Sequence, residues 1–276
     1  MKAAAFDYLR PHSLDEALQA LARSGGEGKI LAGGQSLGPM LNLRLARPQL
    51  LVDISRLEEL RAMERSGEGW RIGAGVTHAA IEDGRATLAG AEVLCGVAGG
   101  IAYRAVRNRG TIGGSLAHAD PAADWPLALA VLGASIEVAS ARGTRRVDAD
   151  RFMLSAFTTE LADDELIAAV HVPALSRGAR WGYYKFCRKT GEFPEASASL
   201  LLDPERRVAR LFVGALSGAP RPLEALARDL AGRGAAAATP GAIDEALAAV
   251  APELDATDRR MHAAVVARAI HQVFES

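Results

Sequence analysis

The chain has 276 residues, enough for one elaborate α/β unit or for two closely packed lobes with a sizeable core. Its 32 Lys and Arg nearly balance its 33 Asp and Glu, so no overall charge favours nucleic acid or an anionic membrane as a partner. Cys95 and Cys187 lie far apart, which argues against a disulfide scaffold, a zinc finger or a cysteine-ligated metal cluster. No segment has the apolar length of a signal peptide or membrane span, so the composition predicts a soluble, cytoplasmic protein.

The N-terminal region predicts a small lobe of β-turn-α-β order that follows an amphipathic helix. Ser13 and Glu16 have the spacing of a capping box, and an apolar stripe follows, so we expect a helix that ends near Gly25. A short strand is expected to run into a glycine turn, and a helix and a second strand are expected after it. These three elements are predicted at residues 29–31, 39–46 and 49–54.

The middle of the chain predicts a mixed α+β region. Two stretches have the pattern of paired strands joined by a tight, glycine-containing turn. The stretch "ELIAAVHVP" then predicts one further strand. The paired strands are predicted within residues 62–76 and 134–147, and the further strand within residues 165–173.

The pattern changes after residue 177. Three consecutive strand-like runs follow, and then helices, of which one begins at Thr239 and Pro240. An apolar stripe from Met261 to Val273 predicts the last helix. The sequence therefore predicts a C-terminal domain with a three-stranded antiparallel sheet and helices. Its strands are expected within residues 181–189, 196–203 and 208–216.

The turn Ala32-Gly33-Gly34-Gln35-Ser36 is a candidate anion site. Its glycines remove side chains that would keep a ligand from the backbone, and successive N–H groups can then point into one concavity. Ser36 is expected to cap the helix that follows. The alternative is a Gly-Gly turn that only reverses the chain, which is the commoner role of such a turn.

A second glycine-rich stretch, "RNRGTIGGSLAHADPAADWP", lies at residues 107–126. Two such turns suit a dinucleotide, because its two phosphates need donors from two sides and its sugars need carboxylate or amide partners. Neither turn has the G-x-G-x-x-G pattern of a Rossmann unit, and no G-x-x-x-x-G-K-[ST] motif is present. Nicotinamide dinucleotide binding by that fold and nucleotide hydrolysis are therefore disfavoured.

"AGGQSLGPMLNLRLARPQLLVDI" and "AVRNRGTIGGSLAHADPAADWP" together resemble the FAD-binding medium subunit of the molybdenum hydroxylases, the family of aerobic carbon monoxide dehydrogenase and xanthine dehydrogenase. The similarity extends from "FDYLRPHSLDEAL" to "YYKFCRKTGEFPEASASL" and is weakest over the last fifty residues. It implies an α+β fold, with an FAD-binding domain of the vanillyl-alcohol oxidase (PCMH) type followed by a smaller α/β domain. The implied ranges are 1–177, with subdomains 1–55 and 56–177, and 178–276.

The resemblance also implies which residues contact FAD. Asp124 matches a position that binds ribityl or ribose hydroxyls, and Lys185 matches a basic position near the flavin. Phe193 stands where similar relatives carry a tyrosine beside the isoalloxazine, which puts any hydroxyl-dependent tuning in doubt. Main-chain groups near Leu161 and Ile167 are expected to border the adenine half. The pyrophosphate contacts and their neighbours are Ala32, Gly33, Gly34, Gln35, Ser36, Leu37, Thr111, Ile112, Gly113, Gly114, Ser115, His118 and Asp120.

Several of these residues also have simpler interpretations. Lys185 is a solvated strand lysine by default, His118 is equally well a turn histidine, and Asp120 before Pro121 is typical of a residue that sets a turn. The arginines at 104, 107 and 109 form a solvated face, support the phosphate loop or dock a partner. Cys95 and Cys187 are expected to be buried, and the acidic run 163–165 is expected to be a loop.

The implied function is electron transfer. The chain lacks the cysteine sets that iron–sulfur clusters need, and no residue is assigned a catalytic or metal-binding role. The resemblance implies that FAD receives electrons from a small subunit with two [2Fe–2S] clusters and passes them to an external acceptor. It also implies a large molybdopterin subunit and a dimer of heterotrimers. An independent flavoenzyme and a cofactor-free assembly subunit stay as alternatives, and the intact glycines count against the second.

Overall fold

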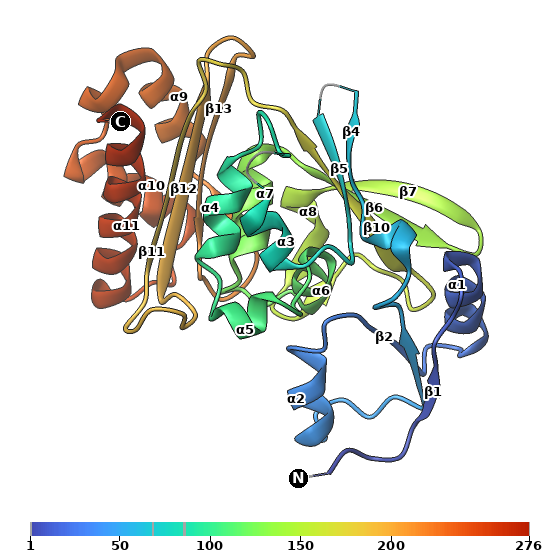
Figure 1. Ribbon diagram of the computed structural model, residues 1–276. Coiled ribbons are helices and arrows are strands. Elements are labelled where there is room, and N and C mark those ends of the chain that lie inside the picture. Colours follow the sequence, from blue (N-terminus) through green and yellow to red (C-terminus); the bar gives the residue numbers. More distant parts are fainter. Residues whose placement is uncertain (1, 68, 85–86, 276) are drawn as a thin grey trace.

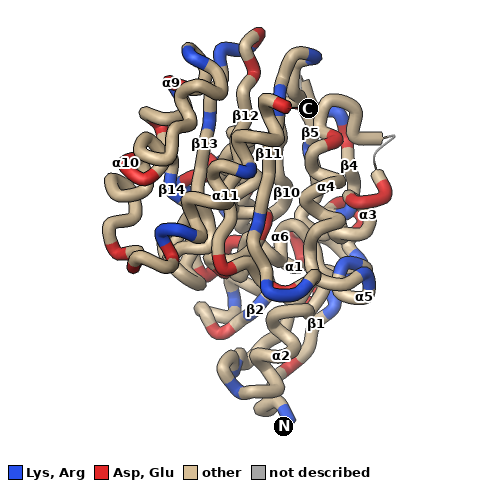
Figure 2. The backbone as a smooth tube through the Cα atoms, turned by 90° about the vertical axis from the view of Figure 1, so that its left-hand side faces the viewer, with Lys and Arg blue, Asp and Glu red and all other residues tan. Residues whose placement is uncertain are grey.

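The computed structural model describes residues 2–67, 69–84 and 87–275 (Figure 1). The described residues form three sheets of three or more strands and one two-stranded ribbon. Lys and Arg are interspersed with Asp and Glu over the view of the backbone in Figure 2. Within the described part of the chain, no helix is both long and apolar enough to cross a membrane.

The N-terminal lobe is a parallel sheet of order β1-β3-β2 with α1 packed on it. Ser13 caps α1 as predicted, because its side chain accepts from the N–H of Glu16 at 3.2 Å. The carboxylate of Glu16 accepts in turn from the N–H of His12 at 2.7 Å. The elements of this lobe are β1 (Asp7–Leu9), α1 (Leu14–Arg23), β2 (Gly28–Leu31), α2 (Leu37–Asn42), β3 (Leu50–Asp53) and η1 (Glu58–Leu60).

The middle region is built on an antiparallel sheet of order β4-β5-β10-β6-β7, in which β10 is central. A β-bulge between Ile167 and Ala169 interrupts the pairing of β10 with β6. Both predicted strand pairs are present. The elements are β4 (Met63–Ser66), β5 (Gly69–Gly73), α3 (His78–Asp83), α4 (Val93–Gly99), α5 (Arg104–Arg107), α6 (Ile112–His118), α7 (Asp124–Leu132), β6 (Ser135–Ser140), β7 (Gly143–Asp148), α8 (Ala149–Phe152), β8 (Met153–Ser155), β9 (Thr158–Thr159) and β10 (Leu166–Pro173).

The C-terminal sheet has four strands in the order β11-β12-β13-β14, not the predicted three. The fourth strand contains only two residues and ends in Pro222, so it has no apolar alternation that a sequence pattern would show. Helices cover the outer face of this sheet in Figure 1. The elements are β11 (Arg180–Phe186), β12 (Ala196–Asp203), β13 (Val208–Gly214), β14 (Arg221–Pro222), α9 (Glu224–Arg233), η2 (Gly234–Ala237), α10 (Pro240–Val250) and α11 (Ala256–Phe274).

Helix α7 joins the middle region to the C-terminal sheet. All nine of its residues are buried, because it contributes to the core beneath the five-stranded sheet and also contacts β12 and β13. Strand β12 is likewise buried along its whole length, between α7 on one face and α11 on the other. Gly182 of β11 allows α11 to approach closely, since a Cβ there would lie 2.0 Å from the carbonyl oxygen of Ala269.

Candidate functional site

The first glycine turn presents a run of unused backbone donors. Within the described residues, none of the N–H groups from Ala32 to Ser36 donates to a protein acceptor, and all five residues are at least partly accessible. Gly34 has φ +73°, which favours glycine, and turns the chain between β2 and α2. Such a run of donors is suited to an anion.

Ser36 does not cap α2, so this prediction was wrong. It occupies the N-cap position, but its φ of −101° and ψ of −51° are helical, and its side chain makes no capping hydrogen bond. A capping serine needs extended backbone to bring its oxygen over the first turn. The Ser36 hydroxyl is consequently available to a ligand beside the same N–H groups.

The two glycine loops are in direct contact. A Cβ on Gly33 would lie 1.9 Å from the carbonyl oxygen of Arg109, and the Arg109 guanidinium donates to the carbonyl of Gly33 at 3.4 Å. Arg109 therefore supports the first loop. The other two arginines of the basic run form ion pairs instead: Arg104 with Glu82 and Asp83, and Arg107 with Glu82.

Four of the five N–H groups from Thr111 to Ser115 donate within the protein, and that of Thr111 has no acceptor among the described residues. The N–H groups of Ile112 and Gly113 donate to the backbone carbonyls of Val76 and Ala74. Those of Gly114 and Ser115 donate to the side chain and the carbonyl of Thr111, the N-cap of α6. The partly exposed Ser115 side chain makes no hydrogen bond with any described residue.

A buried polar cluster links the middle region to the C-terminal sheet. Asp124 begins α7 and its side chain is only 6% exposed. Its Oδ1 accepts from Lys185 Nζ at 2.7 Å and from the Tyr183 hydroxyl at 2.6 Å. Lys185 also donates to the carbonyl of Gly100 at 2.9 Å, so it is not the solvated strand lysine of the alternative interpretation. Burial and the negative charge of Asp124 raise the pKa of Tyr183, which keeps the phenol protonated as a donor.

His78, which no sequence pattern indicated, contacts the residue that follows Asp124 in α7. Its Nδ1 accepts from the indole N–H of Trp125 at 3.1 Å. Burial, and then the positive charge of Arg107, lower the pKa of His78 to about 4. The ring is therefore neutral near pH 7 and acts as an acceptor that fixes Trp125 beside Asp124. A lone histidine after a threonine gives no sequence signal for this role.

The remaining predicted residues lie around these loops. The ring centroid of His118 is 5.2 Å from that of Phe157. Asp120 accepts from the N–H of Ala122 at 2.9 Å, which sets the turn before α7. Phe193 is 62% exposed in the β11–β12 connection. Leu161 precedes β10 and is partly exposed, and Ile167 is buried within β10 beside its bulge.

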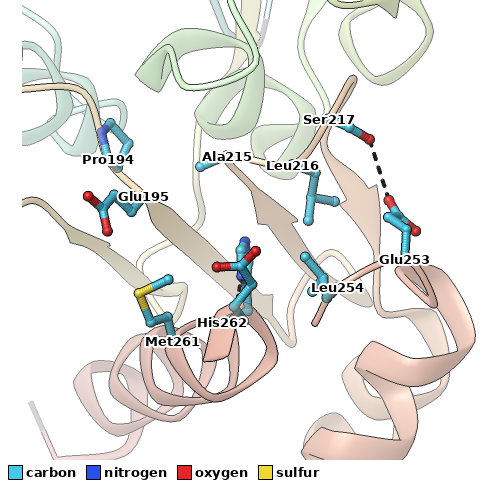
Figure 3. Close-up of a pocket in the computed structure, with 10 residues that line it drawn as sticks. Pro194, Glu195, Ala215, Leu216, Ser217, Glu253, Leu254, Met261 and His262 are labelled. Carbon is cyan, nitrogen blue, oxygen red and sulfur yellow. Dashed lines mark hydrogen bonds between the residues drawn. The ribbon is translucent and has the colours of Figure 1, made fainter. Parts of the chain in front are cut away.

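A separate hollow lies beside the C-terminal sheet. It has a volume of about 440 Å³ and apolar walls that include Leu216, Leu254 and Met261 (Figure 3). Glu195 and Glu253 lie at its edge and already pair with Arg188 and Arg221. In the described ranges, no group of three or more His, Cys, Asp or Glu side chains is placed to hold a metal ion.

Comparison with known proteins supports one family. The family model described as the FAD binding domain in molybdopterin dehydrogenase matches residues 4–175. Subunit alpha of the 6-hydroxypseudooxynicotine dehydrogenase complex from Paenarthrobacter nicotinovorans is 38% identical over 220 residues, 79% of this chain and 74% of that one. The carbon monoxide dehydrogenase medium chain of Hydrogenophaga pseudoflava is 38% identical over 197 residues, 71% and 69% of the two chains. A quinoline 2-oxidoreductase chain from Pseudomonas putida 86 has a TM-score of 0.91 at 32% identity, covering 100% and 99%.

The contact between the glycine loops predicts unequal effects of two alanine substitutions. Gly33→Ala places a methyl group against the Arg109 carbonyl and is expected to destabilise the fold by about 2 kcal/mol. Gly38→Ala, within α2 and with open space around its Cβ, is expected to stabilise it by up to about 1 kcal/mol. Urea unfolding of both variants and the parent measures the difference. Equal midpoints for the two variants would contradict the close approach.

The buried neutral His78 predicts a loss of stability in mild acid. In the unfolded chain its pKa returns to about 6.5, so between that pH and about 4 the unfolded state binds one more proton than the native state. The free energy of unfolding should fall by about 3 kcal/mol over this window. His78→Asn keeps an acceptor for Trp125 and removes the titration, so its unfolding free energy should vary less between pH 7 and 4.5. Parallel pH profiles for the parent and this variant would refute the assignment.

Proposed function

Because the chain belongs to the family of FAD binding domains in molybdopterin dehydrogenases and is an FAD-binding medium subunit of such an oxidoreductase, we propose that it passes electrons from an iron–sulfur partner through FAD to an external acceptor. Bound FAD would supply a redox group that exchanges electrons singly or in pairs. The residues of this chain bind and orient that group, and none of them is assigned a chemical step.

The unused N–H run from Ala32 to Ser36 is the observation that carries the proposal. A pyrophosphate has several anionic oxygens and needs multiple donors, and these N–H groups have no acceptor within the described residues. Ser36 and Ser115 add hydroxyls from the two touching loops, and the Arg109 guanidinium adds a positive charge beside Gly33. This set of donors favours a site for a dinucleotide phosphate over the alternative, in which the Gly-Gly turn only reverses the chain direction.

The two ends of the cofactor are proposed to lie on either side of these loops. Asp124 Oδ2 makes no hydrogen bond with a described residue and is not fully buried, so it is the open acceptor for a ribityl or ribose hydroxyl. The Lys185 ammonium, fixed by Asp124 and Gly100, keeps a positive charge close to the proposed flavin. Leu161 and Ile167 are proposed to border the adenine half, and Phe193 to cover the isoalloxazine.

We propose that partner subunits dock near the β11–β12 connection. Tyr103 and Phe186 expose 62% and 42% of their surfaces there, and Gly191 of the connection lies against the Tyr103 ring. Exposed aromatic side chains beside one another are typical of protein interfaces. The proposed partners are a large molybdopterin subunit and a small subunit with two [2Fe–2S] clusters, in a dimer of heterotrimers. A cytoplasmic location is part of this proposal.

Ligand titration and reduction of the bound flavin test the proposed phosphate site and the proposed role in electron transfer. The protein is expected to bind FAD and to bind riboflavin, which lacks the pyrophosphate, at least about 100-fold more weakly. Its flavin bands should bleach with dithionite and not with small substrates unless the partner subunits are present. Direct bleaching by a small molecule would indicate an independent flavoenzyme. A purified protein that is colourless and takes up no FAD would overturn the proposal.

A further inference from the structure

We propose that Tyr183 is a positioning residue for the carboxylate of Asp124, so that a strand of the C-terminal domain completes the cofactor site. The inference rests on the proposed function, because it concerns the acceptor that Asp124 offers to a cofactor hydroxyl. It assigns a role to a residue that neither glycine motif contains. It also makes cofactor affinity depend on how the C-terminal sheet is placed against α7.

Asp124 receives two donors on one oxygen. The Tyr183 hydroxyl and the Lys185 ammonium approach Oδ1 at 2.6 and 2.7 Å, while Oδ2 has no hydrogen bond with a described residue. Tyr183 and Lys185 are two residues apart on β11, so their side chains lie on the same face of the sheet. Two donors on Oδ1 hold the plane of the carboxylate and leave the other oxygen toward accessible space.

The Tyr183 oxygen is itself held in place. Its ring is stacked on Trp181, with planes 2° apart and centroids separated by 6.4 Å, and both rings pack against the core that contains α7. Lys185 is tied on its other side to the carbonyl of Gly100, after α4. Strand β11 and α7 therefore meet at the Asp124 carboxylate, and the Lys185 ammonium links both to the end of α4.

Loss of the phenol would change which oxygen is open. With Lys185 as the sole remaining donor, the carboxylate is free to rotate and to share both oxygens with the ammonium. Oδ2 would then be an acceptor in competition with an internal ion pair. A ligand hydroxyl that binds Oδ2 would lose affinity, although Asp124 is still present and still charged.

The first experiment compares Tyr183→Phe with Tyr184→Phe in the full chain. Tyr184 is the neighbouring residue on the opposite face, where its hydroxyl accepts from Arg268 at 2.6 Å, so its loss should leave FAD affinity unchanged. Tyr183→Phe is expected to weaken FAD binding about tenfold, the size of one hydrogen bond to a charged group. Titration with riboflavin and with ADP shows which half of the cofactor is affected. If Tyr183 positions Asp124, Tyr183→Phe should weaken the binding of one of these ligands tenfold and leave the binding of the other unchanged. Equal losses for both ligands, as expected if the whole structure loosens, would overturn the inference.

A double-mutant cycle separates positioning from a loss of stability. In the background of Asp124→Asn, Tyr183→Phe should cause no further loss of FAD affinity, because the carboxylate that it positions is gone. If Tyr183→Phe fails to fold, Tyr183→Met replaces it in the cycle, since it also removes the hydroxyl, and should show the same dependence on Asp124. The inference is overturned if Tyr183→Phe leaves FAD affinity unchanged, or if it lowers FAD affinity as much in the Asp124→Asn background as in the parent. In either case the proposed function is unaffected, provided that the parent protein binds FAD. No FAD uptake by the parent overturns the proposed function as well.

Discussion

The burial of α7 on all sides is the constraint on which the site depends. A helix with no polar face must be covered everywhere, so the five-stranded sheet and the C-terminal sheet both pack against it. Its first residue, Asp124, lies at the border between these two bodies. Trp125 and His78 hold that end of the helix, and β11 delivers two donors to the carboxylate. The position of Asp124 Oδ1 thus depends on how α7 packs between the five-stranded sheet and the C-terminal sheet.

Much of the fold was predictable because local patterns agree with the tertiary structure. The capping box at Ser13 and Glu16, the glycine-linked strand pairs and the start of α10 at Thr239 all lie where the sequence predicts them. The two glycine motifs also identified the family, which the comparisons confirm. These features are encoded by a few residues close together in the chain, so they do not require knowledge of distant contacts.

The predictions that needed distant contacts were the weaker ones. Ser36 has the residue type of a helix cap, but its backbone geometry is not that of one. Two N–H groups of the second loop, those of Ile112 and Gly113, donate to Val76 and Ala74, which no spacing within residues 107–126 indicates. Lys185 has the pattern of an exposed strand residue, and the placement of α7 makes it a partly buried partner of Asp124. Such features depend on which surfaces pack together.

The chain order of the site has a consequence for biosynthesis. The glycine turns and Asp124 are encoded in the first half of the chain, whereas Tyr183 and Lys185 follow some sixty residues later, on a strand that needs β12 and α11 to hold it. A ribosome therefore releases the two glycine loops well before Tyr183 and Lys185. The completed site, with both domains in place, exists only once the last helix has emerged, so cofactor loading is expected to follow translation rather than accompany it.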